Sequence, residues 1–211
     1  MIILYIILAI LLLPVVYNLV FPLKLPALDH YFYPGQIFES KWEGVRQEII
    51  RQEGDKVYTE VTLKPGAQGP PEHLHEGFDE SGVVKKGVLT VKLNGEIIEL
   101  RAGDRLSFPK GIYHAFSNNS TEDVVLGAEN DNDSIPVSFA YPLSQFYEFF
   151  DKPSRFKMLH FFFKMSLFGD TFDTYVKQSP IKIQKLIKVI LKPYARVLGY
   201  KLESSKAPTG N

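Results

Sequence analysis

The chain has 211 residues, 45% of them apolar, and no cysteine. This length allows one well-buried core with room for an appendage, and the absence of thiols excludes disulfides and thiolate metal sites. Basic and acidic residues balance at 24 each, but eleven basic residues and only two acids lie between Lys152 and Lys201. Such a distribution indicates a basic segment that meets an anionic partner surface.

The chain begins with an apolar segment. Residues 2–21 carry no charge and consist mainly of isoleucine, leucine and valine around Pro14. A helix of about twenty apolar residues spans the hydrocarbon core of a bilayer. A cleaved signal peptide is the alternative, but the charged start and the small-residue cleavage site of such peptides are missing. We therefore expect a single-pass transmembrane anchor over residues 1–21, and Lys24 favours a cytoplasmic body.

An extended linker or arm is expected next, because residues 22–42 carry three prolines. From 43 to 135 the chain breaks into short β-branched or alternating runs, such as 57–63 and 88–93, separated by turn residues. Asn94-Gly95 lies between two of these runs and is a strong hairpin signal. Short strands at this spacing predict a mainly β fold, either a sandwich or a barrel.

Helical spacing replaces this pattern over residues 141–203. Ser179-Pro180 predicts the start of a basic amphipathic helix, which Pro193 should kink or end and Gly199 should terminate. An aromatic stretch, 156–165, precedes that helix. Two interpretations of these helices stay open: packing against the β domain, or contact with an anionic membrane surface.

Four residues predict a metal site. His73 and His75 lie two apart, so on a strand their side chains project from the same face. Glu80 would face the opposite way on a regular strand unless Gly77 supplies a bulge, and His114 arrives from a later strand. Three imidazoles and one carboxylate suit Fe, Mn, Ni, Cu or Zn, with positions left for water or substrate.

Other residues around the site leave alternatives open. Glu72, Glu76 and Asp79 flank the histidines, and any of them could replace Glu80 as the acidic ligand. Aromatic residues flank His114 and could line a pocket or pack in the core; they are Phe108, Tyr113 and Phe116.

Two glycine-framed motifs carry a family resemblance. The first runs from Gly66 through His73, His75 and Glu80 to Gly87; the second comprises Gly103, Pro109, Gly111, His114 and Asn118. They resemble the two signature motifs of the cupin superfamily, except that six residues rather than five separate Gly66 from His73. The resemblance implies a cupin-type jelly-roll β-barrel, here with an N-terminal transmembrane helix and C-terminal α-helices. It also implies that His73, His75, Glu80 and His114 are the metal ligands.

The superfamily hosts many reactions, so the fold alone does not choose one. We expect a metal-dependent enzyme of oxygenase or isomerase/lyase type that acts on a small molecule near the membrane, with Glu80 as a catalytic base. The alternative is a non-catalytic, membrane-tethered module that binds a ligand or metal. Expected partners are a small molecule, the membrane through the N-terminal helix and the basic C-terminal helix, and a second copy in a homodimer, but no nucleic acid.

Overall fold

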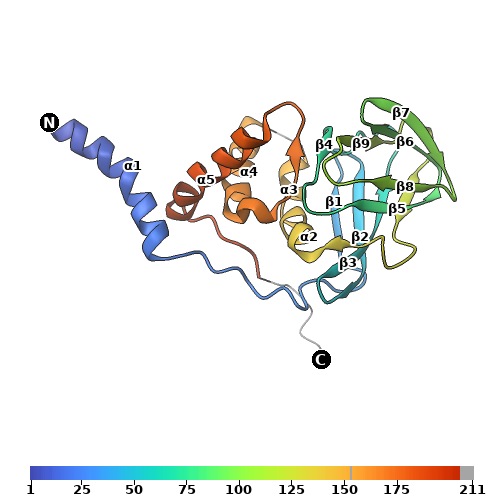
Figure 1. Ribbon diagram of the computed structural model, residues 1–211, viewed down its shortest axis with the longest axis horizontal. Coiled ribbons are helices and arrows are strands. Elements are labelled where there is room, and N and C mark those ends of the chain that lie inside the picture. Colours follow the sequence, from blue (N-terminus) through green and yellow to red (C-terminus); the bar gives the residue numbers. More distant parts are fainter. Residues whose placement is uncertain (153, 205–211) are drawn as a thin grey trace.

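A computed structural model describes residues 1–152 and 154–204, and its elements form an N-terminal helix, two antiparallel sheets and a helical C-terminal part (Figure 1). The larger sheet is ordered β1 (Ile37–Ser40), β2 (Val45–Glu53), β3 (Lys56–Leu63), β10 (Val124–Gly127), β5 (Glu80–Lys86) and β8 (Arg105–Phe108), with β11 (Ile135–Pro136) also paired to β3. The smaller sheet is ordered β12 (Tyr175–Val176), β4 (His73–Leu74), β9 (His114–Ser117), β6 (Val88–Leu93) and β7 (Glu96–Arg101).

The two sheets bury their apolar faces against each other. Strand β6 buries Leu89 and Val91, and β8 buries Leu106 and Phe108 between exposed Arg105 and Ser107. This alternation is the period-two pattern of a half-buried strand. The mainly β prediction is therefore confirmed, with the described strands paired into two sheets rather than one closed ring.

The predicted hairpin is also confirmed. Strands β6 and β7 pair from Val88↔Arg101 to Leu93↔Glu96, which leaves Asn94 and Gly95 as the two-residue loop. Their φ angles are 50° and 91°. Positive φ at both positions is the requirement of a type I′ turn, whose twist matches that of the flanking strands.

The stretch predicted as a linker is more ordered than its prolines indicate. It contains β1, which pairs with β2, and it buries Tyr31 and Phe32 in an aromatic cluster. The Tyr31 ring meets the Tyr141 ring edge-on, with centroids 4.8 Å apart. Aromatic burial therefore holds this segment against the C-terminal part of the chain.

The C-terminal part contains α2 (Val137–Ser144), α3 (Tyr147–Phe150), α4 (Arg155–Phe168), a 3₁₀ turn (Gly169–Thr171) and α5 (Ile181–Val197). Phe146, Phe168 and Phe172 share one core cluster with Ile49 and Val57 of the larger sheet. The helices are thus packed on the β domain. Helix α5 continues through the buried Pro193 and ends before Gly199, which has a φ of 86°.

The N-terminal helix α1 (Ile2–Val20) lies at one end of the molecule, where its C-terminal half contacts α5 (Figure 1). It is long and apolar enough to cross a membrane, and most of its surface is exposed. A membrane anchor and a signal sequence both have these properties.

Candidate metal centre

The fold brings His73, His75, Glu80 and His114 together between the sheets. One ligand atom from each residue lies within 4.8 Å of the others. His73 and His114 are register partners on the neighbouring strands β4 and β9, and their ring centroids are 4.5 Å apart. Pairing of two strands that are far apart in sequence therefore supplies one half of the cluster.

Glu80 reaches the cluster by a different route from the predicted bulge. Strand β4 ends at Leu74, and the loop of residues 75–79 carries the chain across to β5 in the other sheet. Glu80 is the first residue of β5. A change of sheet, rather than a bulge at Gly77 within one strand, directs its carboxylate toward the histidines.

Each histidine is oriented by a backbone carbonyl. Nδ1 of His73 lies 2.8 Å from the carbonyl oxygen of Pro71, and Nδ1 of His75 lies 2.5 Å from that of Asp173. Nδ1 of His114 lies 3.0 Å from the carbonyl oxygen of Ile112. A carbonyl only accepts hydrogen bonds, so Nδ1 carries the proton in each ring. In a neutral ring the Nε2 atom is then left with a lone pair, as in metal-ligating histidines.

The Nε2 atoms of two histidines converge on the Glu80 carboxylate. The Nε2 atoms of His75 and His114 each lie 3.3 Å from Glu80 Oε2, and Nε2 of His75 is buried without a hydrogen-bond partner among the described residues. Lone pairs that converge in this way repel one another unless a proton or a cation lies among them. This donor set fits a divalent transition metal.

The charges of the site reinforce one another. Burial would raise the pKa of Glu80, but the adjacent His114 and His75 hold it well below its usual range. Burial would lower the pKa of His75, but the neighbouring Glu80 carboxylate raises it. Glu80 is therefore ionised at neutral pH. It is also the most exposed of the four side chains, at 21%.

The other acids of this region are engaged elsewhere. Glu72 forms ion pairs with Lys177 at 2.7 Å and with Lys92 at 2.9 Å. Glu76 pairs with Lys185 at 2.6 Å. Asp79 accepts a hydrogen bond from the backbone of Lys110 at 2.8 Å. The structure therefore favours Glu80 over all three as the acidic member of the cluster.

Aromatic rings enclose the histidines. Phe108 stacks on His114 with centroids 4.3 Å apart, and Phe78 stacks on His75 at 4.4 Å. Of the other two predicted pocket residues, Phe116 is part of the core and Tyr113 lies beneath Lys177. Phe139 also contacts His75, at 4.9 Å. Sequence reasoning missed Phe78 and Phe139, because nothing in their local pattern distinguishes them from core residues.

A strap from the C-terminal part, residues 172–177, completes the site. Its strand β12 pairs with β4, with Val176 opposite His73. The carboxylate of Asp173 accepts hydrogen bonds from the backbone of Glu76 at 3.0 Å and of Gly77 at 2.6 Å, while its carbonyl accepts the proton of His75. The strap therefore holds both the loop that follows β4 and one of the histidine rings.

Acidification should destabilise the metal-free protein through His73. Burial, together with His75, lowers the pKa of His73 from 6.5 to about 4. Between these values the unfolded chain binds a proton at His73 that the folded protein does not, so the free energy of unfolding falls as the pH falls. The shift corresponds to roughly 3 kcal/mol. Urea unfolding of chelator-treated protein between about pH 7 and pH 4 measures this loss.

A His73→Gln variant isolates that contribution. The raised pKa of His75 makes the folded protein more stable as the pH falls, which opposes the effect of His73. The wild type alone therefore reports only the sum of the two changes in stability. The variant should lose less stability on acidification than the wild type does. Equal losses in the two proteins would contradict the assignment to His73.

Comparison with known proteins finds a family match within the β domain. Residues 59–127, which include both motifs in full, match the cupin domain family. No curated protein matches the chain. Similar solved structures include a sugar phosphate isomerase of the cupin superfamily from Silicibacter pomeroyi, with 22% identity, a TM-score of 0.38, and 51% of this chain and 76% of that chain covered.

Two further solved structures are similar. KdgF from Halomonas sp. has 28% identity and a TM-score of 0.35, and the match covers 42% of this chain and 84% of that one. An RmlC-like cupin from Shewanella frigidimarina has 19% identity and a TM-score of 0.38, with 49% of this chain and 94% of that one covered.

Proposed function

We propose that this protein is a metal-dependent enzyme in which His73, His75, Glu80 and His114 hold one divalent transition metal. The observation that carries the proposal is the orientation of the histidines. Each donates its Nδ1 proton to a backbone carbonyl, and His75 and His114 turn Nε2 toward the Glu80 carboxylate. A core histidine without a ligand has no need of such an arrangement, whereas a metal ligand does.

The side chains around the cluster have separable roles. A bound metal would act as a Lewis acid on a carbonyl substrate or would bind dioxygen. Glu80, ionised and the most exposed of the four, is placed to accept a proton from a substrate at its carboxylate. Phe78 and Phe108 hold the histidine rings by stacking.

Metal analysis of the purified full-length protein tests the proposal. We expect about one metal per chain in the wild type and none in a His73→Ala/His75→Ala variant, because two of four ligands are lost. A His30→Ala variant is the control, since His30 is exposed and lies outside the cluster. It should retain the metal. Wild-type protein without metal after metal-replete expression would overturn the proposal.

The identity of the metal selects the activity assay. Iron, nickel or copper would direct the search to oxygen uptake, whereas zinc or manganese would direct it to isomerase and lyase substrates. A protein that retains its metal but shows no turnover in these assays would instead be the non-catalytic module that binds a ligand or metal.

We also propose that α1 tethers the protein to a membrane. Its 19 residues rise about 28 Å at 1.5 Å per residue, close to the thickness of a bilayer core. Its apolar side chains are exposed to a degree unusual for a helix of a folded domain. The first charge after it is Lys24, which favours a cytoplasmic body.

A further inference from the structure

Helix α5 exposes its apolar face and buries part of its polar face, the reverse of what amphipathic helices in soluble proteins do. Such helices bury their apolar stripe and expose their polar one. In α5 the apolar side chains of Ile183, Leu186 and Ile190 are 48%, 56% and 51% exposed. Lys188 on the other face is only 2% exposed. These three apolar side chains of the helix are therefore left largely uncovered by the described part of the protein.

The polar face of α5 is used for packing on the strap. Lys188 donates a hydrogen bond from Nζ to the carbonyl of Phe172 at 2.7 Å, and Lys185 pairs with Glu76. Gln184 accepts from the backbone of Val176 and donates to its carbonyl, at 3.1 and 2.8 Å. These contacts account for the inward direction of the lysines and fix the apolar face outward.

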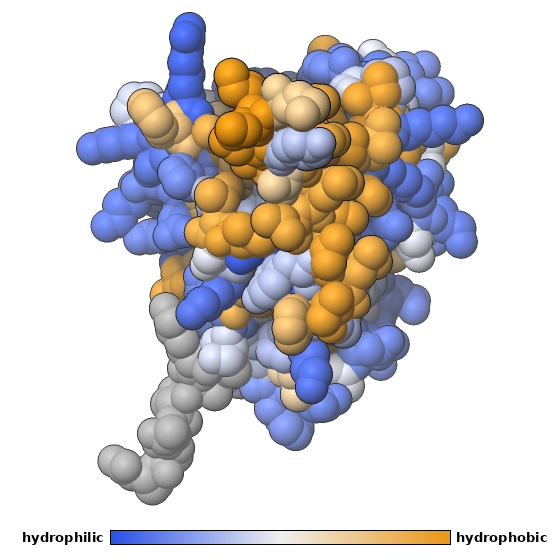
Figure 2. All heavy atoms as spheres, turned by 90° about the vertical axis from the view of Figure 1, so that its left-hand side faces the viewer, coloured by the Kyte–Doolittle hydropathy of each residue, from blue (hydrophilic) through white to orange (hydrophobic). Residues whose placement is uncertain are grey.

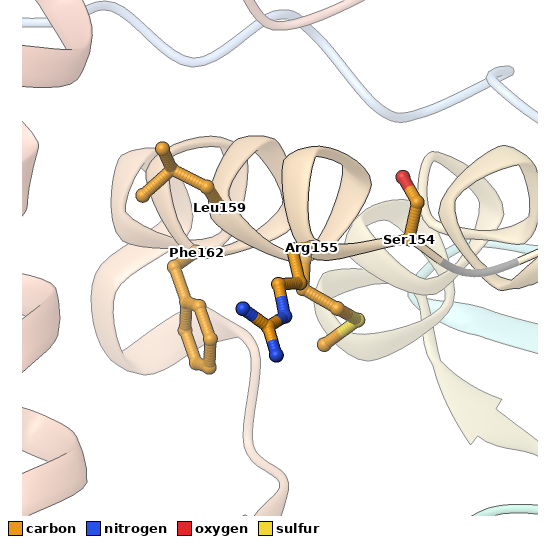
Figure 3. Close-up of a pocket in the computed structure, with 5 residues that line it drawn as sticks. Ser154, Arg155, Leu159 and Phe162 are labelled. Carbon is orange, nitrogen blue, oxygen red and sulfur yellow. The ribbon is translucent and has the colours of Figure 1, made fainter.

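Helix α4 repeats the arrangement beside α5. Phe156, Leu159 and Phe162 are 78%, 52% and 41% exposed, whereas Lys164 and Ser166 are buried. Lys164 donates to the carbonyl of Lys201 at 2.6 Å. Figure 3 shows the shallow hollow on α4, where Arg155 and Phe162 extend from the same side of the helix. Two adjacent helices thus expose apolar residues in the same region.

This exposed surface is continuous with the N-terminal helix. Tyr194 of α5 donates a hydrogen bond to the carbonyl of Leu11 at 3.2 Å, and Arg196 donates to Asn18 at 2.8 Å. An apolar groove runs between the helices, lined by Ile10, Leu13, Phe163, Ile190 and Leu191 among others. Figure 2, in which α1 lies nearest the viewer, shows a broad apolar area on this side of the molecule.

The contact with α1 extends well along its length. Leu11 lies nine residues before the end of α1, or about 14 Å along the axis at 1.5 Å per residue. An apolar medium that surrounds α1 to this depth also reaches the C-terminal half of α5. A protein partner would have to cover the exposed faces of α1, α4 and α5 at once, whereas a lipid phase does so without a specific fit.

Cationic residues border the surface. Arg155 starts α4 and Lys182 lies in the first turn of α5, and neither forms an ion pair with a described residue. Positive side chains at the edge of an apolar helical face suit the headgroups of anionic lipids.

We propose that α4 and α5 form a membrane-docking surface whose apolar residues enter the acyl-chain region of a lipid bilayer. The docking surface is defined by Phe156, Leu159, Phe162, Ile183, Leu186 and Ile190. The inference deepens the proposed tether: the body itself lies against the bilayer, with α5 between the membrane and the strap that holds His75.

Site-directed spin labelling tests the docking surface, because the chain contains no cysteine. The full-length protein is reconstituted in nanodiscs containing phosphatidylglycerol, with a single cysteine label at Leu186, Ile190 or Leu12. A label at Ile97 is the matched control, since this apolar residue is 72% exposed on β7, away from α4 and α5. Collision rates with dissolved oxygen and with an aqueous nickel complex then report the environment of each label.

Labels at Leu186 and Ile190 should collide readily with oxygen and lose most collisions with nickel, whereas the label at Ile97 should do the reverse. If both α5 labels meet nickel as freely as Ile97 does while Leu12 is shielded, the docking surface is wrong and the tether stands. If Leu12 meets nickel as freely as Ile97 does while both α5 labels are shielded, the tether fails and the docking surface stands. Labels shielded from both reagents, with dipolar coupling between copies, would assign the surface to a dimer and overturn the proposal.

Discussion

Replacing Gly69 by alanine should destabilise the protein by roughly 2–5 kcal/mol. Gly69 has a φ of +60°, and a Cβ atom placed there would lie 2.3 Å from the carbonyl oxygen of Phe116. Phe116 belongs to β9, which is held by β6 and also carries His114. Its backbone therefore cannot move without disturbing the sheet, and the substitution adds a steric clash to an unfavourable dihedral angle. Chemical denaturation in detergent measures the loss.

Gly66→Ala is the control for the dihedral angle alone. Gly66 has a φ of +81°, and a Cβ atom there would meet nothing within 4 Å. We expect this variant to lose only about 1–2 kcal/mol. If the two alanine variants were equally stable, the close approach of Gly69 to β9 would not be the cause of the effect.

An Asp173→Ala variant should bind metal about 10–100-fold more weakly than the wild type, the usual cost of losing an outer-shell partner. The carboxylate of Asp173 holds the backbone of Glu76 and Gly77, and its carbonyl orients His75. Without the carboxylate the strap no longer holds the loop that joins His75 to Glu80. Loss of two charge-assisted hydrogen bonds should also lower the free energy of unfolding by roughly 2–4 kcal/mol.

Competition with a chelating dye, using zinc as the probe, measures the change in affinity. Asp170→Ala is the matched control, because Asp170 is exposed and accepts no hydrogen bond from a described residue. It should leave both zinc affinity and stability close to those of the wild type. Similar losses in the two variants would show that negative charge in this region, rather than the contacts of Asp173, supports the site.

The parts of the fold that follow from local sequence were predictable. Strand alternation identified the β domain, Asn94-Gly95 identified a hairpin, and Ser179-Pro180 placed the start of α5. The linker prediction missed β1, because proline content reports backbone preference and not the burial of Tyr31 and Phe32. Tertiary packing decided that segment, and no short-range pattern encodes it.

In the candidate site, too, the local motif was predictable from sequence and the long-range contacts were not. His73, His75, Glu80 and His114 lie at spacings that sequence reasoning could use, and the structure brings all four together. Asp173 lies 98 residues from His75, and one carboxylate in a segment that sequence spacing predicted as helical carries no signal of such a contact. For α5 the amphipathic pattern was visible, but periodicity alone does not tell which face meets the protein.

The pairing of β12 with β4 links the proposed metal site at His73 to the strap, which lies about 100 residues further along the chain. A metal that binds more tightly when the strap is in place must, by thermodynamic reciprocity, favour the docked strap by the same factor. Helix α5 rests on that strap through Lys188 and Gln184. Under the proposed metal binding, metal loading and the seating of the C-terminal helices would form a single linked equilibrium. Protease resistance of residues 172–177 should then rise with metal concentration.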